Sequence, residues 1–278
     1  MPLLDSHWCK LTRAREHLDT LNEDIAAFLQ PDSYSTVIET DERGEFEGRK
    51  RSILRRRVFF SREPDVLRWG TMVGDIVVNL RAALDHVVYA ISVSRDQSVF
   101  INDRSTEFPI TDQPDAFHNP RRRNPPYYEI RGLPSDAKAI VEGLQPYHRR
   151  QLDGVKSDRL WLLREMSNID KHRSLHISTW SALHVQWDIT HLYPGTVIHS
   201  SWVRAPGVLE SGASLAEIDL SYSTYGQPSM EMNRVFQFTV ALDEALPTGN
   251  EPMPNVLTDL WHYVFGVVSC LDPFVRRE

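Results

Sequence analysis

The sequence predicts an α+β protein: a helical bundle built from N-terminal, central and C-terminal helices, with a flanking antiparallel β-sheet and an N-terminal β-hairpin. Three observations favour this fold class. Apolar residues recur at three- and four-residue intervals near both ends of the chain and in its centre. Runs rich in β-branched and aromatic residues lie between these helical segments. The order helix, hairpin, helix, helix, sheet, helix indicates that helices from both ends form one bundle.

The helical segments follow from periodicity and from their boundaries. Residues 5–30 form an amphipathic helix that ends at Pro31, with apolar positions at Trp8, Leu11, Ala14, Leu18, Leu21, Ile25 and Phe28. Pro64 opens a long central helix over 64–94. Further helices are expected over 135–144, with Ser135 or Asp136 as cap, and over 157–172 and 253–271.

The β-rich segments occupy about 34–60 and 174–242. Tyr34–Thr40 and Arg51–Phe60 flank a turn-like cluster, Asp41–Gly44, and so predict a hairpin. Within the later segment the candidate strands are 197–203, 214–222 and 233–242. We expect one α+β domain over 1–278, with a helical core at about 5–30, 64–94, 134–172 and 253–271.

Composition and charge narrow the function classes. The chain has 278 residues, is 41% hydrophobic and carries a formal net charge of −7, which argues against holding nucleic acid by global charge. The charge is nevertheless unevenly distributed. The segment from Arg43 to Arg62 contains eight basic residues and two acids, whereas the segment from Ala205 to the end contains ten acids and three arginines. The basic segment is either an RNA-facing surface, with Arg55, Arg56 and Arg57 on phosphates, or a solvated strand edge.

The sequence also predicts the cellular location of the protein and the absence of a bound metal or cofactor. The apolar run over about 72–93 contains too many polar and charged residues for a membrane span. The N-terminus has no signal-peptide pattern, and Cys9 and Cys270 have no pair spacing typical of zinc or redox sites. We therefore expect a cytoplasmic protein with reduced thiols, no membrane association, no metal and no cofactor.

Two polar stripes interrupt otherwise apolar helices. Asp75, Asn79 and His86 lie along one side of the central helix, with Arg81 and Asp85 beside them. A second stripe on the 157–172 helix contains Trp161, Glu165, Asn168 and His172. If the helices pack together, Asp75, Asn79 and His86 are expected to face Glu165, Asn168 and His172. Such a cluster is either a network that sets helix register or a functional pocket.

The end of the second helix concentrates positive charge. Lys171 and Arg173 flank His172, and the two basic side chains either stabilise the helix end or bind a phosphate.

Arg81, followed after four residues by His86, matches the Arg-x4-6-His motif of the HEPN superfamily, so the chain resembles a HEPN-like protein. The residue after the arginine is commonly polar in active HEPN ribonucleases, and here it is Ala82; Asn79 or Asp85 is the substitute. The chain is also similar, over about 70–180, to a group of uncharacterised bacterial proteins. That similarity rests on four blocks: Asn79–His86, Phe108–Ile110, Leu144–Tyr147 and Asn168–His176.

The HEPN resemblance implies a metal-independent endoribonuclease or nucleotide-acting protein. His86 would move the proton of a ribose 2′-hydroxyl and Arg81 would stabilise charge on phosphorus, with Asn79 and Asp85 as further catalytic candidates. Arg81 and His86 are about 140° apart around one helix and ~7.5 Å apart along it, so a homodimer is expected to bring them together. The expected partners are a second copy, RNA and a neutralising protein.

Two alternatives remain open. The chain is a non-catalytic binding or scaffold module in which the stripes only specify packing. Otherwise it is a metal-dependent hydrolase with Asp75, His86, Glu165 and His172 as ligands.

Overall fold

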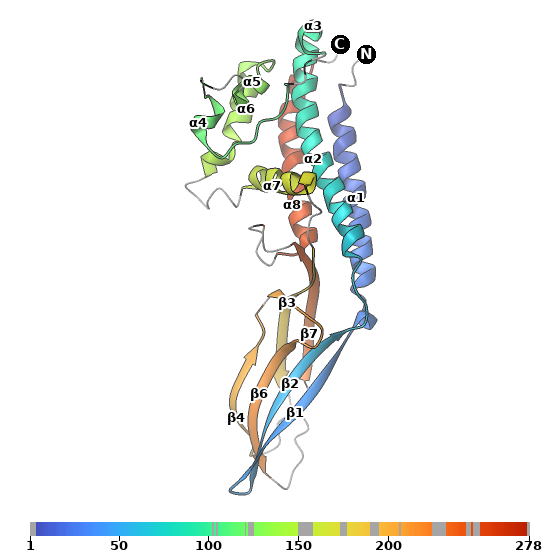
Figure 1. Ribbon diagram of the computed structural model, residues 1–278, viewed down its shortest axis with the longest axis vertical. Helices are drawn as coiled ribbons and strands as arrows, with labels where there is room; N and C mark the ends of the chain where they lie inside the picture. Colours follow the sequence, from blue (N-terminus) through green and yellow to red (C-terminus); the bar gives the residue numbers. More distant parts are fainter. Residues whose placement is uncertain are drawn as a thin grey trace. The chain divides into compact units, whose positions relative to one another are not determined.

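The computed structural model confirms the α+β class: helices and an antiparallel four-stranded sheet coexist in one chain (Figure 1). It describes residues 4–101, 103, 105–119, 121, 125–149, 158–172, 177–189, 195–205, 207–223, 232–242, 246 and 251–276. The chain divides into two compact units. The helical unit comprises Met1–Asn22, Leu67–His176 and Leu242–Glu278, and the β unit comprises Glu23–Val66 and Ile177–Ala241. The single domain expected from the sequence stays a prediction.

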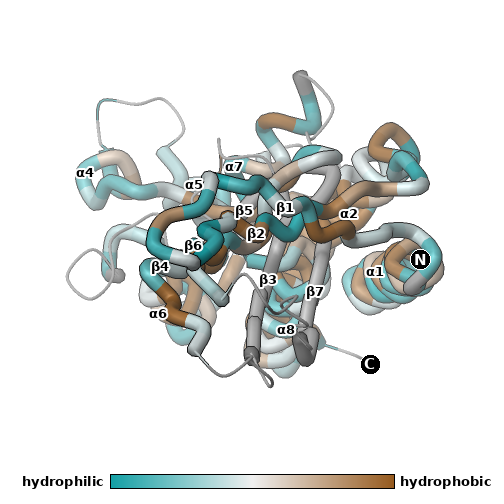
Figure 2. Tube along the Cα trace, turned by 90° about the horizontal axis from the view of Figure 1, so that it is seen from below, coloured by the Kyte–Doolittle hydropathy of each residue, from teal (hydrophilic) through white to brown (hydrophobic). Residues whose placement is uncertain are grey.

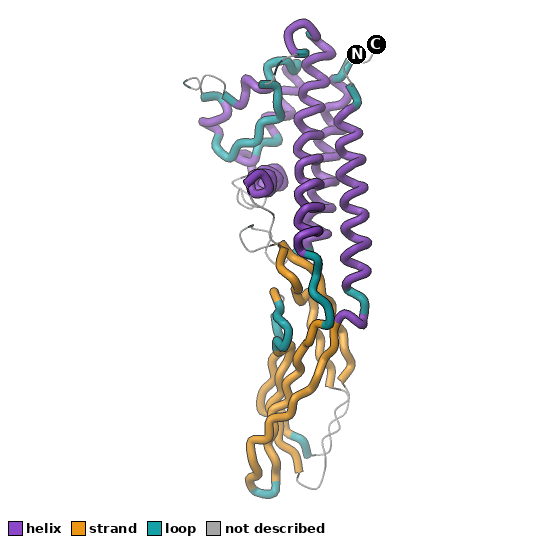
Figure 3. The backbone as a smooth tube through the Cα atoms, turned by 45° about the vertical axis from the view of Figure 1, so that its right-hand side comes forward, coloured by secondary structure: helices purple, strands orange, loops and turns teal. Residues whose placement is uncertain are grey.

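Three long helices lie side by side in the helical unit (Figures 1 and 3): α1 (Ser6–Phe28), α2 (Val66–Arg95) and α8 (Met253–Leu271). Figure 2 shows both hydrophilic and hydrophobic residues along α1, as expected of an amphipathic helix. The indole Nε1 of Trp261 donates to the Leu11 carbonyl over 3.1 Å and joins α8 to α1. These bounds agree with the segments expected from periodicity.

Helix α2 forms the centre of this core. Leu80, Leu84 and Ile91 are completely buried on it. By length and composition α2 could cross a membrane, but most of its apolar stretch is buried inside the protein, which is the environment of a core helix.

The remaining helices of this unit connect α2 to α8. They are α3 (Gln97–Phe100), α4 (Pro114–Phe117), α5 (Pro126–Glu129), α6 (Ser135–Gly143) and α7 (Arg159–His172), with a 3-10 turn at Pro146–Arg149 and another, Asp272–Phe274, after α8. Asp158 begins α7, since its Oδ1 accepts from the backbone N–H groups of Leu160 and Trp161. The expected cap of α6 is wrong: Pro134 occupies the cap position, without a side-chain hydrogen bond.

Two sheets make up the β unit, following the 3-10 turn Pro31–Ser33. The first contains β1 (Tyr34–Phe46), β2 (Arg49–Phe60), β6 (Ser214–Ser223) and β4 (Val197–Val203), all antiparallel in the order β1-β2-β6-β4. The second contains β5 (Gly207–Val208), β3 (Ile177–Ile189) and β7 (Met232–Leu242). Strand β3 was not expected as a separate strand.

The hairpin turn lies three residues beyond its expected place. Glu47 and Gly48 both have positive φ, 51° and 72°, which is the type I′ arrangement that suits two-residue hairpins. Gly44, in the segment expected to turn, has φ 102° at a bulge between β1 and β2. The turn-forming composition of 41–44 therefore produces a bulge, and pairing continues to Phe46 and Arg49.

Glycine substitutions test the packing of the helical unit. A Cβ added at Gly132 would lie 2.6 Å from Ser92 Cβ and 2.9 Å from Phe100 Cζ, so Gly132→Ala is expected to destabilise the protein by about 1–3 kcal/mol. Gly266, exposed on α8, meets nothing within 4 Å. Gly266→Ala is expected to stabilise by about 0.5–1 kcal/mol through helix propensity. Urea unfolding measures both, and equal effects of the two changes would contradict the packing at Gly132.

Candidate functional site

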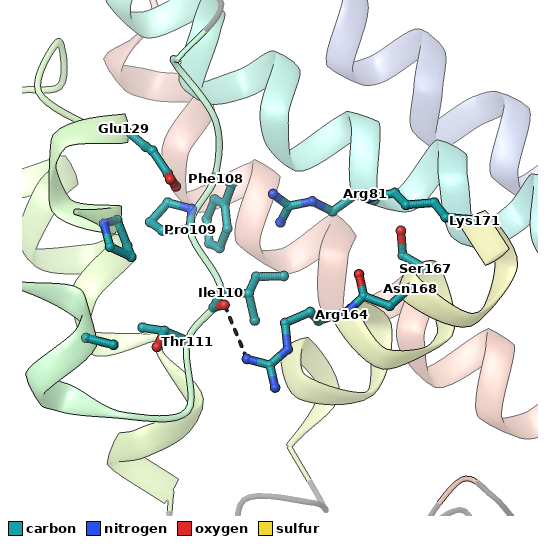
Figure 4. A pocket seen from close by; sticks show the side chains of 12 residues that line it. Arg81, Phe108, Pro109, Ile110, Thr111, Glu129, Arg164, Ser167, Asn168 and Lys171 are labelled. Atoms are coloured by element: carbon teal, nitrogen blue, oxygen red, sulfur yellow. Dashed lines mark hydrogen bonds between the residues drawn. The ribbon is translucent and has the colours of Figure 1, made fainter. Parts of the chain in front are cut away.

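A pocket of about 350 Å³ lies between α2, α7 and the segment 108–111 (Figure 4). We call it the cationic pocket. Its lining contains three basic side chains and one acidic one, together with small polar and apolar residues: Arg81, Phe108, Pro109, Ile110, Thr111, Ala116, Pro126, Glu129, Arg164, Ser167, Asn168 and Lys171. Three of the four sequence blocks contribute lining residues, and Gln145 of the fourth supports the wall.

Asp85 joins α2 to that wall. Its Oδ1 accepts a hydrogen bond from the Phe108 backbone N–H over 2.9 Å and lies 3.0 Å from Nη2 of Arg81. Burial raises the pKa of the Asp85 carboxyl, while Arg81 and the Phe108 N–H act in the opposite direction. One carboxylate therefore positions both the wall and a cation of the pocket.

Gln145 holds the same wall from the other side. Its side chain is completely buried and makes three hydrogen bonds. Oε1 accepts from the Thr111 N–H over 3.0 Å, and Nε2 donates to the carbonyls of Pro109, over 2.8 Å, and Val141, over 3.0 Å. Buried backbone groups in an irregular segment need such partners, and Gln145 supplies them.

The three basic side chains of the pocket differ in how far protein carboxylates and carbonyls pair with them. Arg164 lies 3.0 Å from Glu165 and 3.4 Å from Asp112, and it donates to the Ile110 carbonyl. Arg81 is paired with Asp85 through Nη2, but its Nη1 is buried and has no hydrogen-bond partner among the described residues. Lys171 is exposed and makes no ion pair within the described chain. Among the described residues the pocket thus keeps one unpaired cation, Lys171, and one unused buried donor, Nη1 of Arg81.

The polar stripe of α2 turns away from this pocket. Asn79 Oδ1 accepts from Lys10 Nζ of α1 over 3.3 Å, and Asn79 Nδ2 donates to the Asp75 carbonyl over 2.8 Å. His86 also lies near α1, since Lys10, His7 and the backbone of Ser6 influence the pKa of its imidazole. Burial, followed by the nearby Lys10, lowers the pKa of His86. Its Nδ1 is buried without a partner in the described part of the chain.

Arg81 and His86 therefore contact different elements within one chain. Arg81 lines the cationic pocket and pairs with Asp85, whereas His86 and Asn79 lie toward α1. This follows from their separation around the helix. The homodimer expected to unite them stays a prediction.

Asp75 occupies a third environment. It lines a small cavity of about 190 Å³ with Gly70, Thr71, Gly74 and Asp170. Gly74 permits this approach, because a Cβ there would lie 2.9 Å from Asp170 Cγ. Burial and the neighbouring Asp75 raise the pKa of Asp170. Helices α2 and α7 thus approach each other, but Asp75 does not face Glu165.

The side of α7 that lines the pocket lies one residue earlier in the sequence than the expected stripe, since Arg164, Ser167 and Lys171 directly precede Glu165, Asn168 and His172. Of that stripe, Asn168 lines the pocket, and Glu165 stands beside it as the partner of Arg164. Sequence reasoning missed Arg164 and Ser167, although Arg164, Ser167, Asn168 and Lys171 recur at helical spacing. Arg173 and the His172 side chain lie outside the described residues.

No described group of three His, Cys, Asp or Glu side chains is close enough to share a metal ion. Asp75, His86 and Glu165, proposed as ligands in the hydrolase alternative, each contact different neighbours. The geometry therefore provides no argument for that alternative.

The basic hairpin, in the β unit, is charge-compensated. Arg55 lies 2.6 Å from Glu217 and 3.3 Å from Asp41, and Arg57 lies 2.7 Å from Glu39. Arg56 is buried and donates to Thr36 Oγ1 over 2.7 Å. The three arginines thus have partners within the sheet rather than unused donors for RNA. The expected strand edge is wrong, because β2 lies between β1 and β6.

Gln145→Leu tests the wall of the pocket. The change leaves the Thr111 N–H and the Pro109 carbonyl buried without partners, so we expect a loss of about 2–4 kcal/mol in the free energy of unfolding. Urea denaturation measures it. Gln97→Leu on α3, where the glutamine is exposed, is the matched control and is expected to change stability by less than about 0.5 kcal/mol.

The environment of His86 predicts a pH dependence. Since its pKa is lowered on folding, the unfolded chain takes up the proton first, and stability falls as the pH drops through about 6.5 toward the lower pKa of the folded state. His86→Gln is expected to reduce the stability difference between pH 7.5 and pH 5.0, measured by urea unfolding. His262→Gln, at an exposed position of α8, controls for the loss of one imidazole. An unchanged difference in His86→Gln would contradict the burial of this ring.

Comparisons with protein families, with curated proteins and with solved structures give no match to this chain, so the function has to be argued from the site itself.

Proposed function

We propose that the chain binds a phosphate-bearing ligand, with RNA as the expected source, in the cationic pocket of its helical unit. The observation that carries this proposal is the buried Nη1 of Arg81, which has no hydrogen-bond partner among the described residues. An unsatisfied buried donor on a charged group costs about 1–3 kcal/mol or more, and a phosphate oxygen removes that cost. Guanidinium groups suit phosphate because their planar donors match its oxygens.

Binding is better supported than cleavage by one chain. The cleavage hypothesis needs Arg81 and His86 on the same phosphate, but the two side chains contact different elements. The lining instead combines Arg81, Arg164 and Lys171 with an apolar wall, which is the composition of a small-molecule or nucleotide site.

The second candidate is a metal-independent endoribonuclease that acts as a homodimer with a HEPN-like bundle in the cytoplasm. One observation favours it: burial lowers the pKa of His86, so a neutral imidazole that accepts a proton is available at pH 7. In this proposal a second copy supplies the histidine that the first copy places elsewhere.

Lys171→Met tests the binding proposal. Lys171 is exposed and its loss leaves no buried partner, so stability is expected to stay within about 0.5 kcal/mol of wild type. Fluorescence anisotropy with a short labelled single-stranded RNA is expected to show affinity reduced about tenfold. Arg13→Met removes one exposed positive charge from α1 and is the matched control. Equal affinities of both variants would show that the pocket does not carry the binding.

A cleavage assay separates the two candidates. Mixed cellular RNA is incubated in excess chelator with wild type and with folded His86→Ala. Binding without cleavage by either protein supports the binding module. Cleavage by wild type that disappears in His86→Ala establishes the ribonuclease instead.

A further inference from the structure

The unused hydrogen-bond donors of the cationic pocket come from two helices, α2 and α7. Helix α7 presents Ser167, Asn168 and Lys171 beside the Arg81 side chain that enters from α2 (Figure 4). Arg81 Nη1 has no partner, and no side-chain hydrogen bond of Ser167, Asn168 or Lys171 occurs within the described structure. Arg164 differs, because Ile110, Glu165 and Asp112 already occupy its donors.

The number and charge of these donors distinguish two kinds of phosphate. An internal phosphodiester carries one negative charge and two free oxygens. A terminal phosphate monoester carries about −1.5 to −2 charges at pH 7 and three strong acceptor oxygens. Lys171 Nζ brings one unpaired positive charge, and Arg81, whose guanidinium is also paired with Asp85, adds the donor Nη1. With the Ser167 hydroxyl and the Asn168 amide, these four donor groups exceed the two free oxygens of a phosphodiester and suit the three oxygens of a monoester.

The size and lining of the pocket fit a single nucleotide. The volume of about 350 Å³ is near the lower end of the range of about 300–1,000 Å³ for small-molecule sites. Phe108, Pro109, Ile110, Ala116 and Pro126 form an apolar part of the lining. A phosphate bound by the α7 donors would leave its sugar or base against these residues.

We propose, building on the proposed function, that the cationic pocket recognises a terminal phosphate monoester, as carried by a free mononucleotide or by a phosphorylated RNA end. Lys171 supplies the unpaired positive charge, and Arg81 Nη1, Ser167 and Asn168 donate to the phosphate oxygens. Arg164 holds the 108–111 wall rather than the phosphate, because its own donors are already engaged.

The experiment compares RNA oligonucleotides of one sequence that carry a 5′-phosphate, a 3′-phosphate or only hydroxyl ends. Affinities are measured by anisotropy with an internally labelled strand, and adenosine monophosphate and adenosine serve as competitors. We expect one phosphorylated form to bind about tenfold more tightly than the hydroxyl form, and the monophosphate to compete where the nucleoside does not. Preference for one RNA end, or competition by the mononucleotide alone, identifies the source.

Two variants connect that preference to the pocket. Ser167→Ala and Lys171→Met are expected to weaken binding of the preferred phosphorylated strand more than binding of the hydroxyl-ended strand, and so to reduce the preference for the phosphorylated end. Thermal unfolding confirms that both variants fold. Arg13→Met is expected to keep the full preference.

The outcomes separate this inference from the proposed function. Equal affinity for phosphorylated and hydroxyl-ended RNA, reduced by Lys171→Met, overturns the terminal-phosphate inference and leaves the binding proposal standing. Absence of binding to every strand and to adenosine monophosphate overturns both.

Discussion

The half-buried carboxylate of Asp85 makes the contacts on which the candidate site depends. It accepts the Phe108 N–H and pairs with Arg81, so it connects the central helix to an irregular wall segment. Burial disfavours its charged form, as its raised pKa indicates, and only close partners of opposite polarity offset that cost. Because Gln145 completes the hydrogen bonding of the same segment, the wall has a defined position relative to Arg81.

The two basic regions of the chain show why charge density in a sequence differs from charge available for binding. The hairpin contains the larger surplus, but acids distant in sequence, such as Glu217 and Asp219, pair with Arg55 and Arg51 across the sheet. The cationic pocket contains fewer basic groups and keeps donors unpaired. A ligand contributes more where a buried donor has no protein partner than where an ion pair must first be broken.

The sequence determined the positions of the long helices and most strands. Their apolar periodicity, Pro31 and Pro64 locate α1 and α2, and the last helix begins and ends where expected. It also selected three residues that line the pocket, Arg81, Asn168 and Lys171, and the Asp85 that pairs with Arg81. These are local properties, since helical spacing states which side chains share a face.

Tertiary structure alone decided which neighbour each face meets. Helix α2 is polar on two sides, and the side with Asn79 and His86 contacts α1, while the side with Arg81 contacts α7. Spacing within one helix carries no information about the partner helix, so the shift of the α7 face to Arg164 and Ser167 could not be predicted. The pairing of Arg55 with Glu217 depends likewise on strand register between segments more than 150 residues apart, which long-range packing sets.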